Sequence, residues 1–157
     1  MSGNHHYNID LEWTGNKGEG TSSYRAYSRD YSVSVGGKPT ILGSSDPAFL
    51  GNPARYNPED MFLASVASCH MLWFLHLAST AGIVVVSYVD KASGVMNTNP
   101  DGSGEFTSVT LSPTLMITDA SRSEEAKALH DKVGGLCFIA RSINVPIHHD
   151  VTVHTAR

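Results

Sequence analysis

The sequence predicts an α+β protein, and three observations support that fold class. Val33 and Val35 alternate with serines, a period of two that is typical of a strand. A long uncharged stretch predicts a helix over residues 58–81. Predicted strands precede this helix, and strands, a second helix and a last strand follow it. That order differs from the strict alternation of a doubly wound sheet.

The first 57 residues predict strands that end in a loop. Strands are expected at 7–13, 21–27 and 31–35, with a turn at the glycine-rich segment 16–20 and a break at 36–39. Residues 43–57 contain prolines, glycine, serines and aspartate, which predicts a loop.

The central helix has a clear predicted start and end. Asn57 suits the N-cap and Pro58 the first helical position, while Glu59 and Asp60 favour the positive end of the helix dipole. Gly82 predicts the end.

The remaining residues predict strands at 84–95 and 106–117 around a turn-rich connection. An S-x-x-E pattern at Ser121 and Glu124 predicts a capping box for a helix that ends at two glycines. A short helical turn is expected at 137–142, and a last strand at 146–155.

Length and charge bound the function. The chain has 157 residues, which predicts a single domain over 1–157, divided into 1–57, 58–81 and 83–157. Its formal net charge of −4, with no cluster of lysine or arginine, argues against nucleic acid or a membrane as partner. The first ten residues lack the pattern of a signal peptide, so a cytoplasmic location is expected.

Residues 61–86 contain no acidic or basic side chain and are long enough to span a bilayer. However, serines and two histidines lie within the stretch, and the residues before it are acidic rather than basic. A glycine also ends the helix before a β-branched run begins. The sequence therefore predicts the buried helix of a soluble protein or dimer.

Two cysteines, Cys69 and Cys137, permit one redox pair, although either alone also suits an inert core position. A reactive buried thiolate needs a nearby cation, and the candidates are Arg25, Arg29, Lys38 and Arg55. Glu59 either orients such an arginine or only complements the helix dipole.

Glu59 and Cys69 are ten residues apart, about 15 Å along a straight helix. A shared site then needs a bridging arginine, a broken helix or a second subunit. The chain also has 8 histidines, but His70 and His76 do not share a helix face, and no H-E-x-x-H or C-x-x-C motif occurs. We therefore predict neither a metal site nor a bound cofactor.

Residues 56–62 (YNPEDMF) and 64–71 (ASVASCHM) resemble the signature of the OsmC/Ohr family, the osmotically inducible and organic hydroperoxide resistance proteins. Residues 136–142 (LCFIARS) resemble the second cysteine motif of this family. The residues C-H-M-L-W at 69–73, with Tyr27-Ser28-Arg29 before the loop, are most similar to the OsmC-like branch.

The resemblance implies antiparallel sheets around a long buried central helix, in an intertwined homodimer with its sites at the interface. It implies a peroxiredoxin-like, thiol-dependent peroxidase that reduces organic hydroperoxides in a stress response. Cys69 would be the peroxidatic cysteine and Cys137 the resolving one, joined in a redox-active disulfide. Glu59 would orient a catalytic arginine, with Arg29 the best match and Arg25 the second.

A dithiol, such as a lipoylated protein, would restore the thiols. The apolar side chains of Phe62, Met71, Leu72 and Trp73 are candidates for a pocket that favours organic peroxides, or for ordinary core packing. Two other functions remain open. One is a non-enzymatic dimeric protein that binds a small hydrophobic ligand, and the other is a Cys/His metal site.

Overall fold

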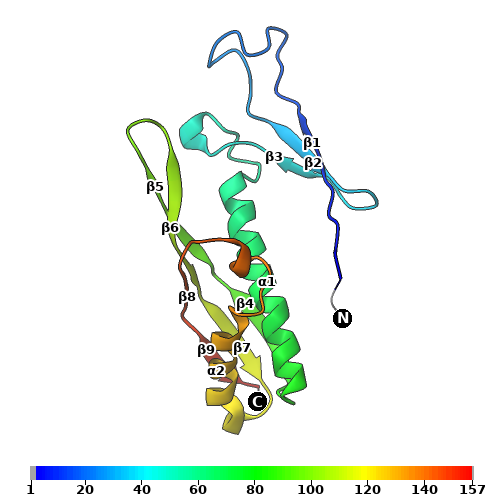
Figure 1. Ribbon diagram of the computed structural model, residues 1–157, viewed down its shortest axis with the longest axis vertical. Coiled ribbons are helices and arrows are strands. Elements are labelled where there is room, and N and C mark those ends of the chain that lie inside the picture. Colours follow the sequence, from blue (N-terminus) through cyan, green and yellow to red (C-terminus); the bar gives the residue numbers. More distant parts are fainter. Residues whose placement is uncertain (1–2, 157) are drawn as a thin grey trace. The chain divides into compact units, whose positions relative to one another are not determined.

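The computed structural model describes residues 3–156, which form two compact units divided between Met61 and Phe62. The first unit contains a small sheet, and the second contains two sheets and two helices (Figure 1). The long helix α1 (Pro58–Thr80) begins in the first unit and continues in the second.

The first unit is a three-stranded antiparallel sheet in the order β1-β2-β3. Its strands are β1 (Asp10–Trp13), β2 (Tyr31–Ser34) and β3 (Ile41–Gly43), and a 3-10 turn η1 (Pro47–Phe49) follows them. Gly43 lies opposite Tyr31, and a side chain at Gly43 would overlap the tyrosine ring.

The strand predicted at 21–27 is wrong, because this segment forms turns. Its backbone groups bond locally, with the amide of Ala26 donating to the carbonyl of Ser23 at 3.1 Å. The side chain of Arg29 donates to the carbonyls of Tyr24 and Tyr27, so these groups are not available to a sheet.

Helix α1 begins and ends as the sequence predicts. The side chain of Asn57 accepts from the amide of Asp60 at 2.8 Å, and the carboxylate of Asp60 accepts from the amide of Asn57 at 3.2 Å. This reciprocal pair satisfies amides that an unpaired helix start would leave free. Gly82 ends the helix with φ 73°, a conformation that suits glycine.

The second unit has two mixed sheets. One joins β4 (Val85–Asp90), β7 (Pro113–Ile117) and β9 (Thr152–Thr155). The other joins β5 (Ser93–Thr98), β6 (Gly104–Leu111) and β8 (Ile147–His149). The expectation of antiparallel sheets alone is wrong, because β8 pairs with β6, and β9 with β7, in parallel. A helical crossover between these partners allows parallel pairing.

The strands predicted at 84–95, 106–117 and 146–155 each divide into two shorter strands. The chain passes from one sheet to the other at each break, at Lys91-Ala92, at Ser112 and at Asp150-Val151. The carboxylate of Asp90 accepts from the amide of Ser112 at 2.8 Å, which joins two of these crossings.

Helix α2 (Ser123–Val133) follows the 3-10 turn η2 (Ala120–Arg122). The predicted capping box is wrong, because Ser121 belongs to η2, where Asp119 accepts from its amide. A last 3-10 turn, η3 (Ala140–Ser142), lies in the predicted helical segment 137–142.

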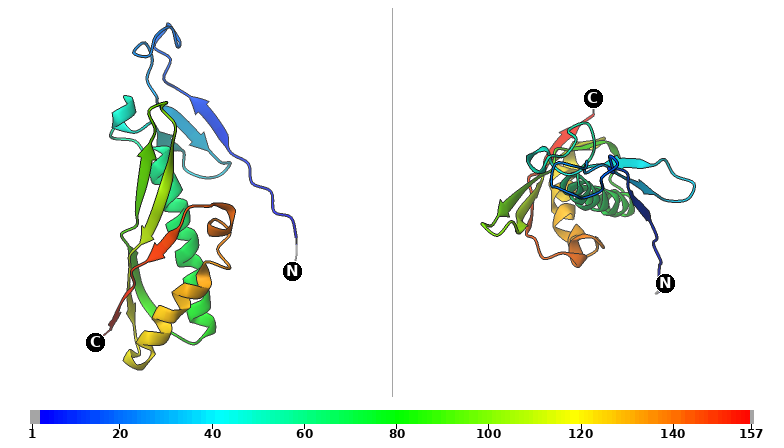
Figure 2. Two further views of the ribbon diagram at one scale, coloured as in Figure 1. Left: turned by 60° about the vertical axis from the view of Figure 1, so that its left-hand side comes forward. Right: turned by 90° about the horizontal axis from the view of Figure 1, so that it is seen from above.

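The core of the second unit lies between α1, α2 and the sheet of β4, β7 and β9 (Figure 2). The buried positions of α1 are Val66, His70, Phe74 and Ala78, four residues apart on one face. Helix α1 is long and apolar enough to span a membrane, but it serves as the central helix of this fold. Within residues 3–156, only this one face of α1 is fully buried.

Candidate functional site

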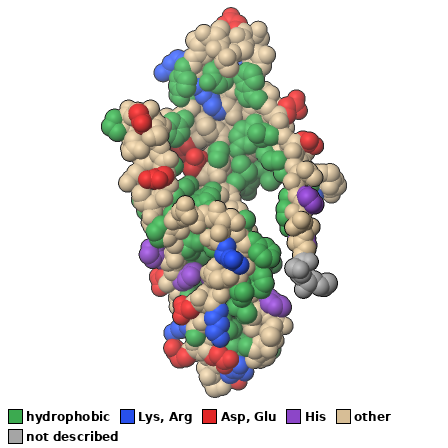
Figure 3. All heavy atoms as spheres, viewed as in Figure 1, with side chains coloured by type: hydrophobic (Ala, Val, Ile, Leu, Met, Phe, Trp, Pro, Cys, Tyr) green, Lys and Arg blue, Asp and Glu red, His purple; other side chains and the backbone are tan. Residues whose placement is uncertain are grey.

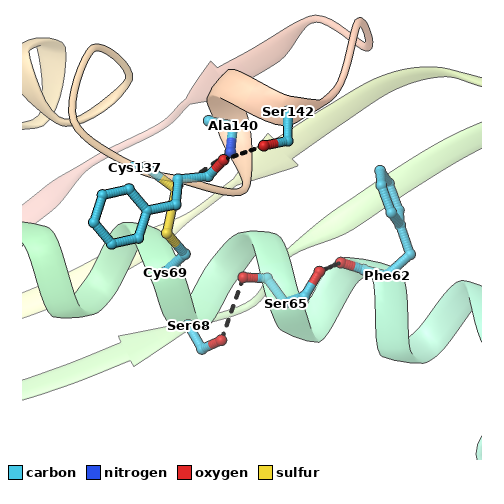
Figure 4. Close-up of a disulfide and its surroundings, with 8 residues drawn as sticks. Phe62, Ser65, Ser68, Cys69, Cys137, Ala140 and Ser142 are labelled. Atoms are coloured by element: carbon cyan, nitrogen blue, oxygen red, sulfur yellow. Dashed lines mark hydrogen bonds between the residues drawn. A yellow bond between two sulfur atoms is a disulfide. The ribbon is translucent and has the colours of Figure 1, made fainter. Parts of the chain in front are cut away.

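The two cysteines lie together in the second unit. Cys69 is on α1 and Cys137 follows α2, and their sulfurs are joined in a disulfide with Cα atoms 5.8 Å apart (Figure 4). The fold thus joins two residues that are 68 positions apart in the sequence.

Cys137 is held by backbone interactions on both sides. Its amide donates to the carbonyl of Val133 at 2.8 Å, which continues the turn of α2. The amide of Ala140 donates to its sulfur at 3.4 Å. Cys137 is 1% exposed, whereas Cys69 is only partly buried. A soluble reagent therefore meets the Cys69 sulfur more readily.

The predicted arginine lies in the first unit, in a cage of two tyrosines. The guanidinium of Arg29 donates to the carbonyls of Tyr27 at 2.8 Å and Tyr24 at 2.6 Å, and it stacks on both rings at 4.3 and 4.2 Å. These contacts fix its orientation and leave donors free, since a guanidinium has five. Arg25, the second candidate, is exposed.

Glu59 lies in the first turn of α1, where its charge raises the pKa of Tyr31 after the larger effect of burial. Within residues 3–61, no ion pair joins Glu59 to an arginine, and the pair that does form links Arg55 to Asp30 at 3.7 Å. Helix α1 is unbroken from Glu59 to Cys69, which removes a broken helix from the three alternatives.

The four candidate pocket residues do not gather in one place. Phe62 stacks on Phe106, with ring centroids 4.6 Å apart, and lines a different cavity. Trp73 packs edge-to-face on Phe138, the neighbour of Cys137, with centroids 5.7 Å apart. Leu72 is 63% exposed beside Trp73, so these two residues form an apolar surface near the disulfide.

Three histidine side chains, those of His70, His130 and His149, lie close together near the disulfide. The Nε2 atom of His70 lies 2.8 Å from the Nδ1 atom of His130, and the rings of His70 and His149 are 4.5 Å apart. A cavity of about 80 Å³ is lined by His70, His149 and Cys137 together with apolar side chains. Burial lowers the pKa of each histidine, so the cluster is neutral near pH 7.

Sequence reasoning missed His130 and this cluster. A usable signal was present, since His130 shares the apolar stripe of α2 with Ala126, Leu129 and Val133. The same signal could not show that His149 on β8 lies near His130 on α2, because no local pattern relates these two segments. Among residues 3–156, no group of three histidine, cysteine or acidic side chains is arranged to hold a metal ion.

The fold and the cysteine pair define a class of protein. The family model described as "OsmC-like protein" matches residues 51–152, which is more than half of the chain. The chain therefore belongs to the OsmC-like protein family, as its motifs indicate.

Solved structures agree with this family. An OsmC-like protein of unknown function from Vibrio cholerae is 28% identical, with a TM-score of 0.83 over 94% of this chain and 99% of that one. An organic hydroperoxide resistance protein from Elizabethkingia anophelis is 20% identical, with a TM-score of 0.67 over 97% and 99%. An OsmC-like protein from Mycoplasma pneumoniae is 17% identical, with a TM-score of 0.71 over 95% and 97%. No curated protein matches the chain.

Proposed function

We propose that this protein is a thiol-dependent peroxidase that reduces organic hydroperoxides to alcohols. The observation that supports it most is the Cys69–Cys137 disulfide, which joins a partly buried sulfur to a buried one. Distant relatives of the same fold include organic hydroperoxide resistance proteins. A pair of this kind can take up a two-electron oxidation as a disulfide and return to two thiols.

The proposed cycle has three balanced steps. The Cys69 thiolate attacks the O–O bond of the hydroperoxide, and with one proton this gives a Cys69 sulfenic acid and an alcohol. The Cys137 thiol then displaces the hydroxyl as water and forms the disulfide. A dithiol, such as a lipoylated protein, reduces the disulfide and is itself oxidised to a cyclic disulfide.

Arg29 is proposed to hold Cys69 as a thiolate and to polarise the peroxide, and Glu59 to orient the guanidinium through a bidentate pair. The tyrosine cage supports the choice of Arg29 over Arg25, because it presents a guanidinium of fixed orientation. A pre-oriented cation stabilises developing charge without the cost of reorganisation.

An apolar substrate fits the surface beside the disulfide. Leu72, Trp73 and His76 line an open groove of about 230 Å³, and Phe138 adds a side chain that is 68% exposed. This surface can bury the hydrocarbon part of an organic hydroperoxide, an interaction that hydrogen peroxide cannot make.

We further propose that the protein is a homodimer that works in the cytoplasm. One face of the first sheet presents Leu11, Trp13, Val33 and Ile41 in two adjacent rows. Leu11 is 65% exposed, and this face borders an apolar groove of about 680 Å³. Hydrophobic side chains are also visible on the surface in Figure 3. A second copy of the chain would cover such a patch.

Thiol counting tests the peroxidase. Reduced protein is mixed with cumene hydroperoxide, and free thiols are then titrated in denaturant. We expect two thiols to be lost per chain, with one cumyl alcohol formed. Retention of both thiols at stoichiometric peroxide would refute the enzyme and favour a second function.

That second function is a dimeric protein that binds a small hydrophobic ligand without chemistry. The apolar groove bordered by Leu11 and Trp13 has the volume of a small-molecule site and favours this alternative. An environment-sensitive dye that binds one per chain and is displaced by hydrophobic compounds, with thiols unchanged by peroxide, would support it.

A further inference from the structure

The buried sulfur of Cys137 presents a problem of proton transfer. When the disulfide opens, this sulfur leaves as a thiolate that must gain a proton, and when the disulfide closes the thiol must lose one. Cys137 is 1% exposed, so bulk water does not reach it directly. Some group within the protein has to connect this sulfur with solvent.

The histidine cluster lies where such a connection is needed. Cys137, His70 and His149 line the same cavity, whose volume of about 80 Å³ is enough to hold a water molecule. His70 is 3% exposed and His149 is partly exposed, so the cluster runs from the buried side of the cavity toward solvent.

The hydrogen bond between His70 and His130 orients a ring that faces the cavity. It joins His70 Nε2 to His130 Nδ1 and requires one ring to donate and the other to accept. Two arrangements satisfy it, and they differ only in which nitrogen of each ring holds the proton. In either arrangement His130 holds the His70 ring beside the cavity that Cys137 also lines.

A second observation concerns unpaired polar groups in and around the cluster. His130 is 1% exposed, and within residues 3–156 its Nε2 atom has no hydrogen-bond partner. The Tyr88 hydroxyl and one carboxylate oxygen of Asp90, on the neighbouring strand β4, are likewise buried without partners in the described chain. Unpaired buried polar groups cost free energy, so each calls for an explanation such as a bound water molecule or a role in chemistry.

We propose that His70 and His149 form a proton relay across this cavity between solvent and the Cys137 sulfur, with His130 as a positioning residue that holds the His70 ring. The proposal rests on the proposed function only in requiring that the disulfide opens and closes. A dithiol thiolate attacks the Cys69 sulfur, the S–S bond breaks, and its electron pair leaves on Cys137. In one concerted step the Cys137 sulfur takes a proton across the cavity from the relay and His149 takes one from solvent, so that no ring is left without a proton. The second thiol of the reductant then releases Cys69, and the reductant ends as a cyclic disulfide.

Several charged or titratable groups face the relay. His70 comes from α1, His130 and Asp131 from α2, and His149 from β8, where the neighbouring His148 is exposed. Tyr88 and Asp90 come from β4, where burial raises the pKa of both. Since burial also keeps the histidines neutral, the relay exchanges protons without placing a charge beside the disulfide.

The test follows the opening of the disulfide by dithiothreitol, with no peroxide present, in His70→Gln and His149→Gln. Glutamine keeps a hydrogen-bonding group but cannot exchange a proton between two ring nitrogens. We expect the opening rate to fall about tenfold or more in both variants. His148→Gln is the matched control, because His148 is the exposed neighbour on the same strand, and it should keep the wild-type rate.

Chemical rescue separates a relay from a structural role. Imidazole should restore the opening rate of a His149→Gly variant, whereas N-methylimidazole, with one nitrogen blocked, should not. Unchanged rates in both glutamine variants, or a loss in His149→Gly that imidazole does not restore, would overturn the relay. If peroxide fails to oxidise Cys69 while these rates behave as expected, the peroxidase is refuted and the relay stands.

Discussion

The two compact units of the chain differ in whether the candidate site residues within them contact one another. The second unit brings Cys69 and Cys137 together and packs its core around Phe74 and Val133, which are fully buried. The first unit holds Arg29 and Glu59 apart from any ion pair with each other, and all four side chains of β1 are exposed.

This contrast indicates that the redox pair is a property of one chain, while the first unit needs something more. An exposed edge strand with large apolar side chains is rarely left uncovered in a protein that stays in solution. In the proposed homodimer a second copy of the chain would cover this face, and the effect of each unit on the cysteine pair can be tested separately.

The largest effect is expected within the second unit. Cys69→Ser should abolish hydroperoxide turnover with a dithiol reductant, because the attacking thiolate is lost. Cys137→Ser should consume one peroxide per chain and then stop, leaving a sulfenic acid that dimedone traps in mass spectrometry. Full steady-state turnover by Cys137→Ser would show that Cys137 is not the resolving cysteine.

The next effect tests the contribution of the first unit. Arg29→Ala should lower the rate of Cys69 oxidation by about 100-fold, because a pre-oriented cation no longer stabilises the thiolate and the developing alkoxide. Stopped-flow measurement of sulfenic acid formation would give this rate. Arg25→Ala is the control and should react at the wild-type rate, and a reversed outcome would assign the catalytic role to Arg25.

A smaller effect is expected on assembly. Leu11→Asp places a charge in the exposed apolar face of the first sheet and should raise the dimer dissociation constant at least about tenfold. Leu42→Asp is the matched control, because Leu42 is 52% exposed on the opposite face, in the row of Ser32 and Glu12. Analytical ultracentrifugation would separate the two, and equal effects would argue against this interface.

A pH dependence of stability belongs to the second unit alone. Burial lowers the pKa of His70 and His130 below the ordinary value of about 6.5, so both are neutral in the fold and gain protons more readily when unfolded. The stability that the two neutral histidines contribute is fully present above pH 6.5. It is lost as the pH falls toward the pKa values of these histidines in the folded protein.

The free energy of unfolding should therefore decrease below pH 6.5 by up to about 1.4 kcal/mol per pH unit for each histidine. Urea unfolding at several pH values would measure it, and His130→Gln should flatten the dependence. A free energy of unfolding that stays constant between pH 6.5 and 4.5 would contradict neutral burial of the cluster.

Much of the fold could be predicted because local signals act over a few residues. Asn57 and Gly82 bound α1 as expected, since capping and a left-handed glycine depend only on neighbouring backbone. The capping box at Ser121 was predicted wrongly because Asp119 forms a competing local bond. The long predicted strands failed for another reason, since a change of sheet at Ser112 leaves no mark on residue periodicity.

The candidate site, like the fold, has parts that the sequence predicts and parts that it does not. The sequence by itself determined the family, the two cysteines and the start of the central helix, because each depends on residue identity and short-range spacing. Only the tertiary structure joined Cys69 to Cys137 and brought His70, His130 and His149 together. These arrangements depend on packing between distant segments, whose relative positions no local pattern encodes.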